Sequence, residues 1–176
     1  SILNRYVKSQ FTLTYKATIG ADFLTKLVER EKYKINLQIW DTAGTEKYHA
    51  MGQSFYRNSQ TCVLVFDLTQ PESFKDIETW RTSFLSTLNP IDPDHFPFIL
   101  LGNKSDQENE IKVTKEEIDA YCKEHNNMPY FATSAKEDIN LEEAFNQVAD
   151  LAIEINTKIN GEENFVPPKN ISIRPQ

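Results

Sequence analysis

The pattern of apolar and polar positions predicts strands and helices that alternate along most of the chain. Ile35, Leu37 and Ile39 alternate with polar residues, which is typical of a half-buried strand. The run FLTKLV (23–28) precedes this strand across the charged turn EREKYK, so the two are predicted to form a hairpin. The run CVLVFDL (62–68) is continuously apolar, as expected for a parallel strand that is covered on both faces.

Helices are predicted between these strands from apolar spacing and capping signals. The first residues, SILNRYVKSQF, already show an apolar helical face. Thr69-Gln-Pro-Glu offers a capping box for a helix that begins near residue 71, Thr114-Lys-Glu-Glu caps another, and Asn140-Leu-Glu-Glu opens the last. With the further strands FPFILL and YFAT, the alternation predicts an α/β fold. We expect a mostly parallel sheet with helices on both faces, one antiparallel hairpin strand, and ligands at the carboxyl ends of the strands.

Length and composition indicate one globular domain followed by a tail. We expect a domain over residues 1–158 and a flexible, polar and proline-rich tail over residues 159–176. The net charge of −7 argues against a nucleic-acid partner, because a phosphate backbone needs a basic surface. No apolar run reaches the length of a membrane span. Cys62 and Cys122 have no metal-ligand spacing and are interpreted as reduced cysteines of a cytosolic protein.

The segment LGNKSD (101–106) follows the strand FPFILL and suits recognition of guanine. Asp106 can accept two parallel hydrogen bonds from the ring N–H and the exocyclic amino group of guanine, a donor pair that adenine lacks. Asn103 can contact the other edge of the base, and the stem of Lys104 can cover its face. Alone, these residues would also fit an ordinary polar loop.

The segment ATSAK (132–136) follows the next strand and supplies a second half of such a pocket. Ser134 and the backbone N–H groups of Ala135 and Lys136 can close the pocket around the base. By itself this segment would fit a simple turn from strand to helix. Two half-pockets in order, each after a parallel strand, predict a guanine site.

The segment WDTAG (40–44) is suited to the phosphate end of a nucleotide. Asp41 at the strand end can hold Mg²⁺ through water, and Gly44 lets the backbone approach a γ-phosphate. The Thr18 hydroxyl, in YKATIGADF, can ligate Mg²⁺ when that phosphate is present. In isolation Thr18 would be read as an exposed loop threonine.

Together, YKATIGADF, LQIWDTAG, FYRNS, LVFDLT, LGNKSD and TSAK resemble a Rab-type small GTPase. FLSTLNPIDPDHFPFILLGNK and KATIGADFLTK are most similar to the late-endosome and lysosome (vacuolar) branch. The resemblance implies a Ras-like P-loop GTPase fold that binds GTP and GDP with Mg²⁺. It also implies trafficking effectors, an exchange factor and a GTPase-activating protein as partners.

The resemblance assigns further residues to the site and to an effector surface. Tyr15 joins the nucleotide-binding set. Phe23, Trp40 and Phe55 match the aromatic triad that effectors read, and Ile19 belongs to the same surface. Burial of the triad between hairpin and sheet is the alternative, and partial burial fits both readings.

The chain departs from the family pattern in two places that concern phosphate chemistry. The 176 residues contain no phosphate loop GxxxxGK[ST], because none of the five glycines precedes a lysine, and we expect that they are a fragment whose natural beginning is missing; a chain that naturally has no such loop is the alternative. In the family, the strand that leads into this loop is central and would lie between INLQIW and CVLVFDL. Without it, we expect these two strands to lack a partner at that position. We also expect GTP to bind poorly. Thr45 stands where the family has the Gln that orients the attacking water, so we expect weak hydrolysis and a long-lived GTP state. The alternative is that the hydroxyl acts through a second water, or that a partner supplies the group.

Two functions therefore remain in view. The first is a GTP/GDP switch of vesicle trafficking. Such a switch would be cytoplasmic or lie at the cytosolic face of late endosomes and lysosomes. Whether this chain hydrolyses GTP is left open. The second is a nucleotide-free, Rab-like interaction module. No cysteine follows Cys122, so membrane attachment is expected only if a lipidation site lies beyond these residues.

Overall fold

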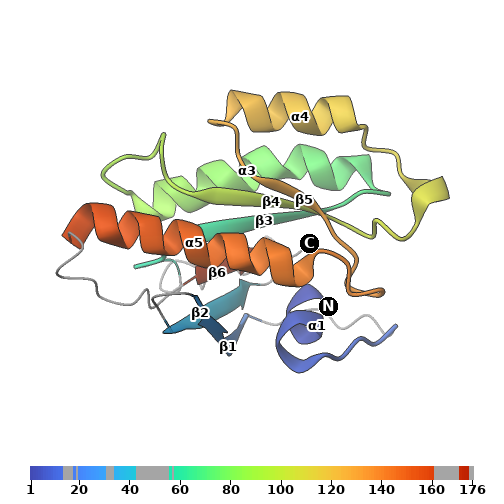
Figure 1. Ribbon diagram of the computed structural model, residues 1–176. Helices are drawn as coiled ribbons and strands as arrows, with labels where there is room; N and C mark the ends of the chain where they lie inside the picture. Colours follow the sequence, from blue (N-terminus) through green and yellow to red (C-terminus); the bar gives the residue numbers. More distant parts are fainter. Residues whose placement is uncertain are drawn as a thin grey trace.

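The computed structural model describes residues 1–13, 18, 20–30, 34–42, 56, 58–160 and 171–174. These residues form a twisted sheet with helices on both faces, as Figure 1 shows. In chain order the elements are α1 (Ile2–Lys8), β1 (Ala21–Glu29), β2 (Lys34–Thr42), β3 (Thr61–Asp67), α3 (Pro71–Leu88), β4 (Phe98–Asn103), the 3₁₀ turn η2 (Glu108–Glu110), α4 (Lys115–Glu124), β5 (Tyr130–Ala132), α5 (Leu141–Asn160) and β6 (Ile171–Arg174).

The sheet has six described strands in the order β1-β2-β6-β3-β4-β5. β1 and β2 form the predicted antiparallel hairpin, with Phe23 paired to Trp40. The remaining neighbours run parallel, including β3 with β4 and β4 with β5. The prediction of a mostly parallel α/β sheet with one antiparallel hairpin strand is confirmed.

Two apolar layers cover the sheet. On one face, α1 and α5 pack against β2, β3 and β4, and the ring of Tyr6 stacks on that of Phe145 with centroids 4.0 Å apart. On the other face, α3 and α4 bury Ile77, Phe84 and Ile118. β3 is covered from both sides, and residues 61–66 are all buried. Its continuous apolar sequence therefore reflects burial on both faces.

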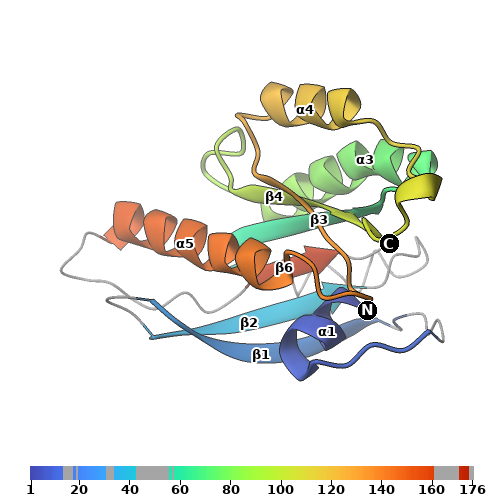
Figure 2. The ribbon, with the colours of Figure 1, turned by 45° about the vertical axis from the view of Figure 1, so that its right-hand side comes forward.

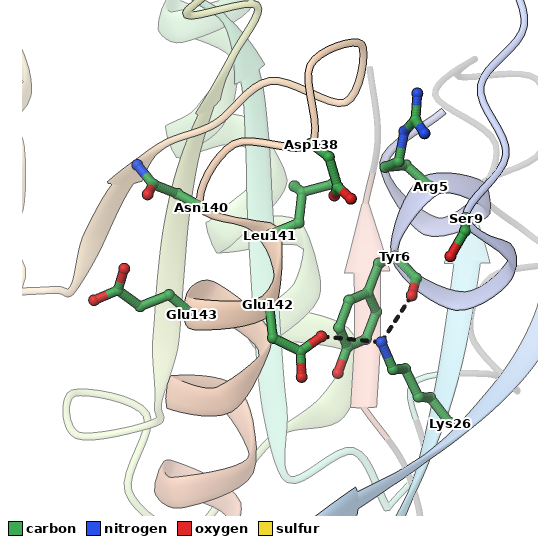
Figure 3. A pocket seen from close by; sticks show the side chains of 9 residues that line it. All are labelled: Arg5, Tyr6, Ser9, Lys26, Asp138, Asn140, Leu141, Glu142 and Glu143. Carbon is green, nitrogen blue, oxygen red and sulfur yellow. Dashed lines mark hydrogen bonds and ion pairs between the residues drawn. The ribbon is translucent and has the colours of Figure 1, made fainter.

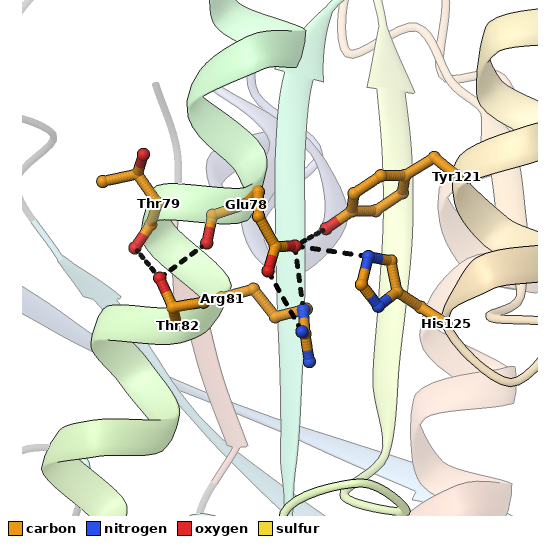
Figure 4. A network of polar contacts seen from close by, with 6 residues as sticks. All are labelled: Glu78, Thr79, Arg81, Thr82, Tyr121 and His125. Atoms are coloured by element: carbon orange, nitrogen blue, oxygen red, sulfur yellow. Dashed lines mark hydrogen bonds and ion pairs between the residues drawn. The ribbon is translucent and has the colours of Figure 1, made fainter.

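The two helices of the second face are also tied together by a polar network. Glu78 of α3 accepts two hydrogen bonds from Arg81, at 3.0 and 3.1 Å, and one from the Tyr121 hydroxyl at 2.9 Å (Figure 4). His125 Nε2, just after α4, lies 3.3 Å from the same carboxylate. Burial would raise the pKa of Glu78, but the hydrogen bonds from Arg81 and Tyr121 outweigh it and lower that pKa.

One capping prediction is confirmed and the other is wrong. Thr114 caps α4 as expected, with a reciprocal bond to Glu117. Thr69 does not cap α3: its backbone N–H and its hydroxyl both donate to the Asp67 carboxylate, at 2.9 and 2.7 Å. The helix begins at Pro71, as predicted, and the fixed φ of proline suits this first position. The nearby carboxylate competes successfully with the helix backbone for this hydroxyl.

The largest difference from the sequence analysis concerns the end of the chain. Residues 159–176 were expected to form a flexible tail, whereas α5 extends to Asn160 and Ile171–Arg174 form β6. β6 lies between β2 and β3 and pairs with both (Figure 2). The expectation that these two strands lack a partner at that position is therefore wrong. A boundary at residue 158 stays a prediction.

Candidate nucleotide-binding site

The first half of the candidate base site is the turn that follows β4. Gly102 packs tightly here, since a Cβ would lie 2.8 Å from the Tyr130 hydroxyl and 3.0 Å from the ring of Phe66. Lys104 then adopts a left-handed conformation, with φ of 67°. This turn places Asp106 beside the loop that follows β5, with its side chain 12% exposed.

The second half is the loop after β5, and hydrogen bonds join it directly to the first. The Ser134 hydroxyl donates to Asp106 Oδ1 at 2.6 Å and accepts from the Glu137 N–H at 3.0 Å. The Ala135 N–H donates to Asn103 Oδ1 at 3.2 Å. The predicted half-pockets therefore lie together at the carboxyl ends of β4 and β5.

The Asp106 carboxylate keeps capacity for a ligand in this arrangement. Ser134 uses one lone pair of Oδ1, and Lys136 Nζ stands 4.0 Å from Oδ2. An ionised carboxylate has about four acceptor positions, so two parallel bonds from a base edge remain available. Because Ser134 also accepts from a backbone N–H, its hydroxyl hydrogen is directed toward Asp106. This hydrogen bond holds the Asp106 carboxylate in one orientation in the absence of a ligand.

Lys104 lies in the same loop but pairs with a different residue. Its Nζ is 2.6 Å from Asp67 Oδ2, at the carboxyl end of β3. Burial would raise the pKa of Asp67, but the bonds from Lys104 and Thr69 outweigh it and lower that pKa. The ion pair ties the base loop to a third strand end. Whether the Lys104 stem covers a base stays a prediction.

Arg5 also supports the site, and the sequence analysis did not identify it. From α1 it donates to two backbone carbonyls of the second loop, through Nε to Ala135 O and through Nη2 to Lys136 O, both at 2.9 Å. The planar guanidinium suits two parallel donations of this kind. The sequence gives no signal for this role. Arg5 lies on a helix that also carries Lys8, and the partners of Arg5 are main-chain atoms.

A polar groove of about 330 Å³ lies beside these contacts, lined by α1, β1 and the start of α5. Figure 3 shows Lys26 between two of its walls, where Nζ donates to Tyr6 O at 2.8 Å and to Glu142 at 3.0 Å. Glu142 is largely exposed. The groove thus has its central cation already paired, and we assign no ligand to it.

On the candidate phosphate side, the described residues that bear on a metal are Asp41 and Thr18. Asp41 stands near the end of β2, and its Oδ1 is buried without a hydrogen-bond partner among the described residues. Burial raises its pKa to about 6, Asp22 adds to the effect, and the amino-terminal charge opposes it. A buried, unsatisfied carboxylate oxygen fits a Mg²⁺ ion or its water shell. Thr18 is half-buried.

Several predicted site residues lie outside the described residues. They are Tyr15, Ile19, Gly44, Thr45 and Phe55. Their assignments stay predictions.

Of the predicted aromatic surface, two members are described and contact each other. Phe23 and Trp40 face each other across the hairpin, with ring centroids 4.7 Å apart. Phe23 is 45% exposed and Trp40 is half-buried. A large, exposed aromatic side chain on a rigid strand is the kind of group that binding surfaces use.

No group of three or more His, Cys, Asp or Glu side chains in the described part of the chain could hold a metal ion. None of the helices in that part has both the length and the apolar character needed to cross a bilayer.

The chain is similar to a family model and to known GTP-binding and Ras-related proteins. The Ras family model matches residues 1–154. "GTP-binding protein yptV5" of Volvox carteri is 47% identical over 95% of this chain and 80% of its own length. "Ras-related protein Rab7" of Drosophila melanogaster is 48% identical over 88% of this chain and 74% of its own. "Ras-related protein Rab-7a" of Paramecium octaurelia is 44% identical over 95% and 80%.

Proposed function

Because this chain belongs to the Ras family, on its Rab7-like branch, we propose that it is a GTP-binding switch of vesicle trafficking. It would bind GTP and GDP in turn and recruit effectors in the GTP form, at late endosomes and lysosomes. An exchange factor and a GTPase-activating protein would drive the cycle. The observation that carries the proposal is the hydrogen bond from Ser134 to Asp106, which joins two loops into one site.

The base-binding part of this proposal follows from the chemistry of that bond. A carboxylate that is already oriented loses little freedom when it accepts the N–H and amino groups of guanine. Adenine would leave the same carboxylate unpaired, and an unpaired buried charge is strongly unfavourable. Asn103, held by the Ala135 N–H, would contact the other edge of the base, and Lys136 would complete the pocket. The site would therefore select guanine.

On the phosphate side, Asp41 and Thr18 would hold Mg²⁺, which supplies positive charge to the phosphates when bound. The buried, unsatisfied Asp41 Oδ1 supports this assignment. Gly44 would offer its N–H to the γ-phosphate, and Tyr15 would lie near the nucleotide. Ile19, Phe23, Trp40 and Phe55 would form the surface that effectors read.

Hydrolysis would be slow, because Thr45 takes the place of the water-orienting Gln. A threonine hydroxyl is shorter than an amide arm and branched at Cβ, so it does not span water and phosphate together. Single-turnover GTP hydrolysis, in this chain extended at its amino terminus by a phosphate loop, tests the idea. Thr45→Gln should raise the rate at least about tenfold. An unchanged rate would contradict the idea that Thr45 is the cause of slow hydrolysis.

A second function is favoured by one specific observation. The central sheet position between β2 and β3, which leads into the phosphate loop in the family, is held here by β6. In that state the chain would act as a nucleotide-free module that presents Phe23 and Trp40 to partners.

Calorimetric titration separates the two functions. The chain, extended at its amino terminus by a phosphate loop, is titrated with GDP, GTP and ADP at equal Mg²⁺. The switch predicts measurable binding of GDP and GTP and at least about tenfold weaker binding of ADP. Equal binding of GDP and ADP would contradict the guanine site, and no binding of any nucleotide would support the interaction module.

A further inference from the structure

β1 is the outermost strand of the described sheet on the hairpin side. It pairs with β2 along all nine of its residues, and within the described part of the chain its other edge adjoins no strand. Figure 2 shows β1 at the bottom of the sheet, beyond β2. In an antiparallel pair, the backbone groups of alternate residues point to the partner, so those of the remaining residues of β1 point outward. An outward row of N–H and C=O groups can pair with a further strand.

The features that commonly protect such an edge are missing or neutralised in β1. Residues 21–29 contain no proline, and their nine consecutive pairs with β2 leave no bulge. The single cation of this strand, Lys26, donates to Tyr6 O at 2.8 Å and to Glu142 at 3.0 Å, on the side of α1 and α5. Because this charge is already paired, it does not repel a neighbouring strand.

The face of β1 that points away from α1 and α5 carries exposed apolar side chains. Phe23 and Leu27 lie on this face with Thr25 between them, and they are 45% and 58% exposed. Val28, on the opposite face, is buried. A strand that pairs with the edge of β1 would place its own side chains beside Phe23 and Leu27. It would thereby remove part of their apolar surface from water.

The sequence of β1 is complementary to itself in one antiparallel register. Thr25 is the middle one of its nine residues, so two copies of β1 pair along their full length only when Thr25 faces Thr25. In that register Phe23 of each copy faces Leu27 of the other, on the exposed face. Cross-strand contacts between large apolar side chains contribute to the stability of a sheet. The two-fold arrangement forms this contact twice, once on each side of Thr25.

The charged residues of β1 also suit this register. Asp22 faces Val28 and Glu29 faces Ala21, so no two like charges stand directly opposite each other. Asp22 lies diagonal to Lys26 of the other copy, and these charges are opposite. A shift that made Lys26 face Lys26 would bring like charges together and would pair fewer residues.

We propose that β1 is a homodimer interface, at which two copies of this chain pair antiparallel about a two-fold axis through Thr25. The two sheets would then continue into each other across the pair of β1 strands. A second copy is the partner because the same residues of both strands meet in complementary contacts, as a two-fold interface requires. Each copy carries a net charge of −7 and the contact is one strand wide, so the dimer is weak and reversible. The inference does not depend on nucleotide binding.

Disulfide formation in the full chain tests the register. Thr25→Cys should form a covalent dimer on mild oxidation, because directly opposed residues lie within the range that a disulfide bridges. Leu27→Cys alone should not, because its two copies lie four residues apart along the strands, about 13 Å. A mixture of Phe23→Cys and Leu27→Cys should form the mixed dimer. The unaltered chain is the control, since Cys62 and Cys122 are buried. Equal cross-linking of Leu27→Cys and Thr25→Cys, or none of Thr25→Cys, would overturn the register.

Sedimentation equilibrium of the full chain measures the association. The chain should form a reversible dimer with a Kd of about 100 μM or tighter. Phe23→Glu and Leu27→Lys should each raise this Kd at least about tenfold, because each places a charge opposite an apolar side chain. Ile111→Lys, which changes an exposed apolar residue outside β1, should leave the Kd unaltered. A chain that is still monomeric at about 1 mM would contradict the proposal.

Mixing the two charged variants distinguishes pairing in this register from a loss of folding. Phe23→Glu and Leu27→Lys should associate with each other at least about tenfold more tightly than either does with itself, because the introduced carboxylate and ammonium then face each other. Circular dichroism should show that both variants keep the fold, since both positions are exposed. A mixture that does not recover association, or a single variant that dimerises like the unaltered chain, would rule out this interface.

Discussion

The Ser134 hydroxyl donates a 2.6 Å hydrogen bond to Asp106 Oδ1 across 28 positions of sequence. The two residues follow different strands, β4 and β5, which run parallel and therefore end at the same edge. The bond converts two loops into one recognition surface with an oriented carboxylate.

Ser134→Ala should loosen the base site. The substitution removes the donor to Asp106 and the acceptor for the Glu137 N–H, so two hydrogen bonds are lost. We expect the free energy of unfolding to fall by about 1–2 kcal/mol and GDP to bind about tenfold more weakly. Urea denaturation and calorimetry measure the two effects. Ser86→Ala, which removes an exposed hydroxyl within α3, is the control and should change neither.

Arg5→Ala should weaken the same site, because Arg5 supports the loop that follows β5. Loss of the donations to Ala135 O and Lys136 O should lower the free energy of unfolding by about 1–3 kcal/mol and weaken GDP binding. Arg5→Lys should recover only part of either effect, because an ammonium cannot present the two fixed N–H donors. Lys8→Ala on the same helix is exposed and serves as the control. Full recovery by lysine would indicate that charge alone matters.

Asp41 should make the chain less stable as pH rises from about 4 to about 6. Its pKa is raised from 3.8 to about 6 by burial, so between these values the folded chain binds more protons than the unfolded one. The unfolding free energy should therefore decrease across this window and level off above it. Asp41→Asn should remove that decrease and be more stable at pH 7 by about 2–3 kcal/mol. Chemical denaturation from pH 4 to 7, read as the difference between the two chains, provides the measurement. A difference independent of pH would contradict the assignment.

Much of this architecture can be predicted from local sequence because the signals are strong and agree. Alternation in the hairpin, the continuous apolar run of β3 and the Thr114 cap each specify one structure. Asp106 and Ser134 could be placed together because the carboxyl ends of parallel strands meet at one edge. Each motif alone is a weak signal, but the topology brings the two together, so their combination predicts a specific site.

Other features could not be predicted because the sequence does not distinguish between alternative partners. Arg5 binds main-chain carbonyls more than 100 positions away, and any residue could supply those atoms. Thr69 had two acceptable partners, the α3 backbone and the Asp67 carboxylate, and its hydroxyl donates to the carboxylate. The segment 171–174 is too short to indicate a central strand, since its pairing depends on β2 and β3 rather than on its own propensity.

The base preference of the Asp106→Asn variant tests the guanine site most directly. An amide can accept from the ring N–H of xanthine and donate to its 2-carbonyl, whereas it cannot accept both guanine donors. Calorimetry with GDP and XDP should show that the unaltered chain prefers GDP and that Asp106→Asn prefers XDP, while the nearby, exposed Asp138→Asn keeps the original preference. An Asp106→Asn chain that still prefers GDP would mean that this carboxylate does not read the base.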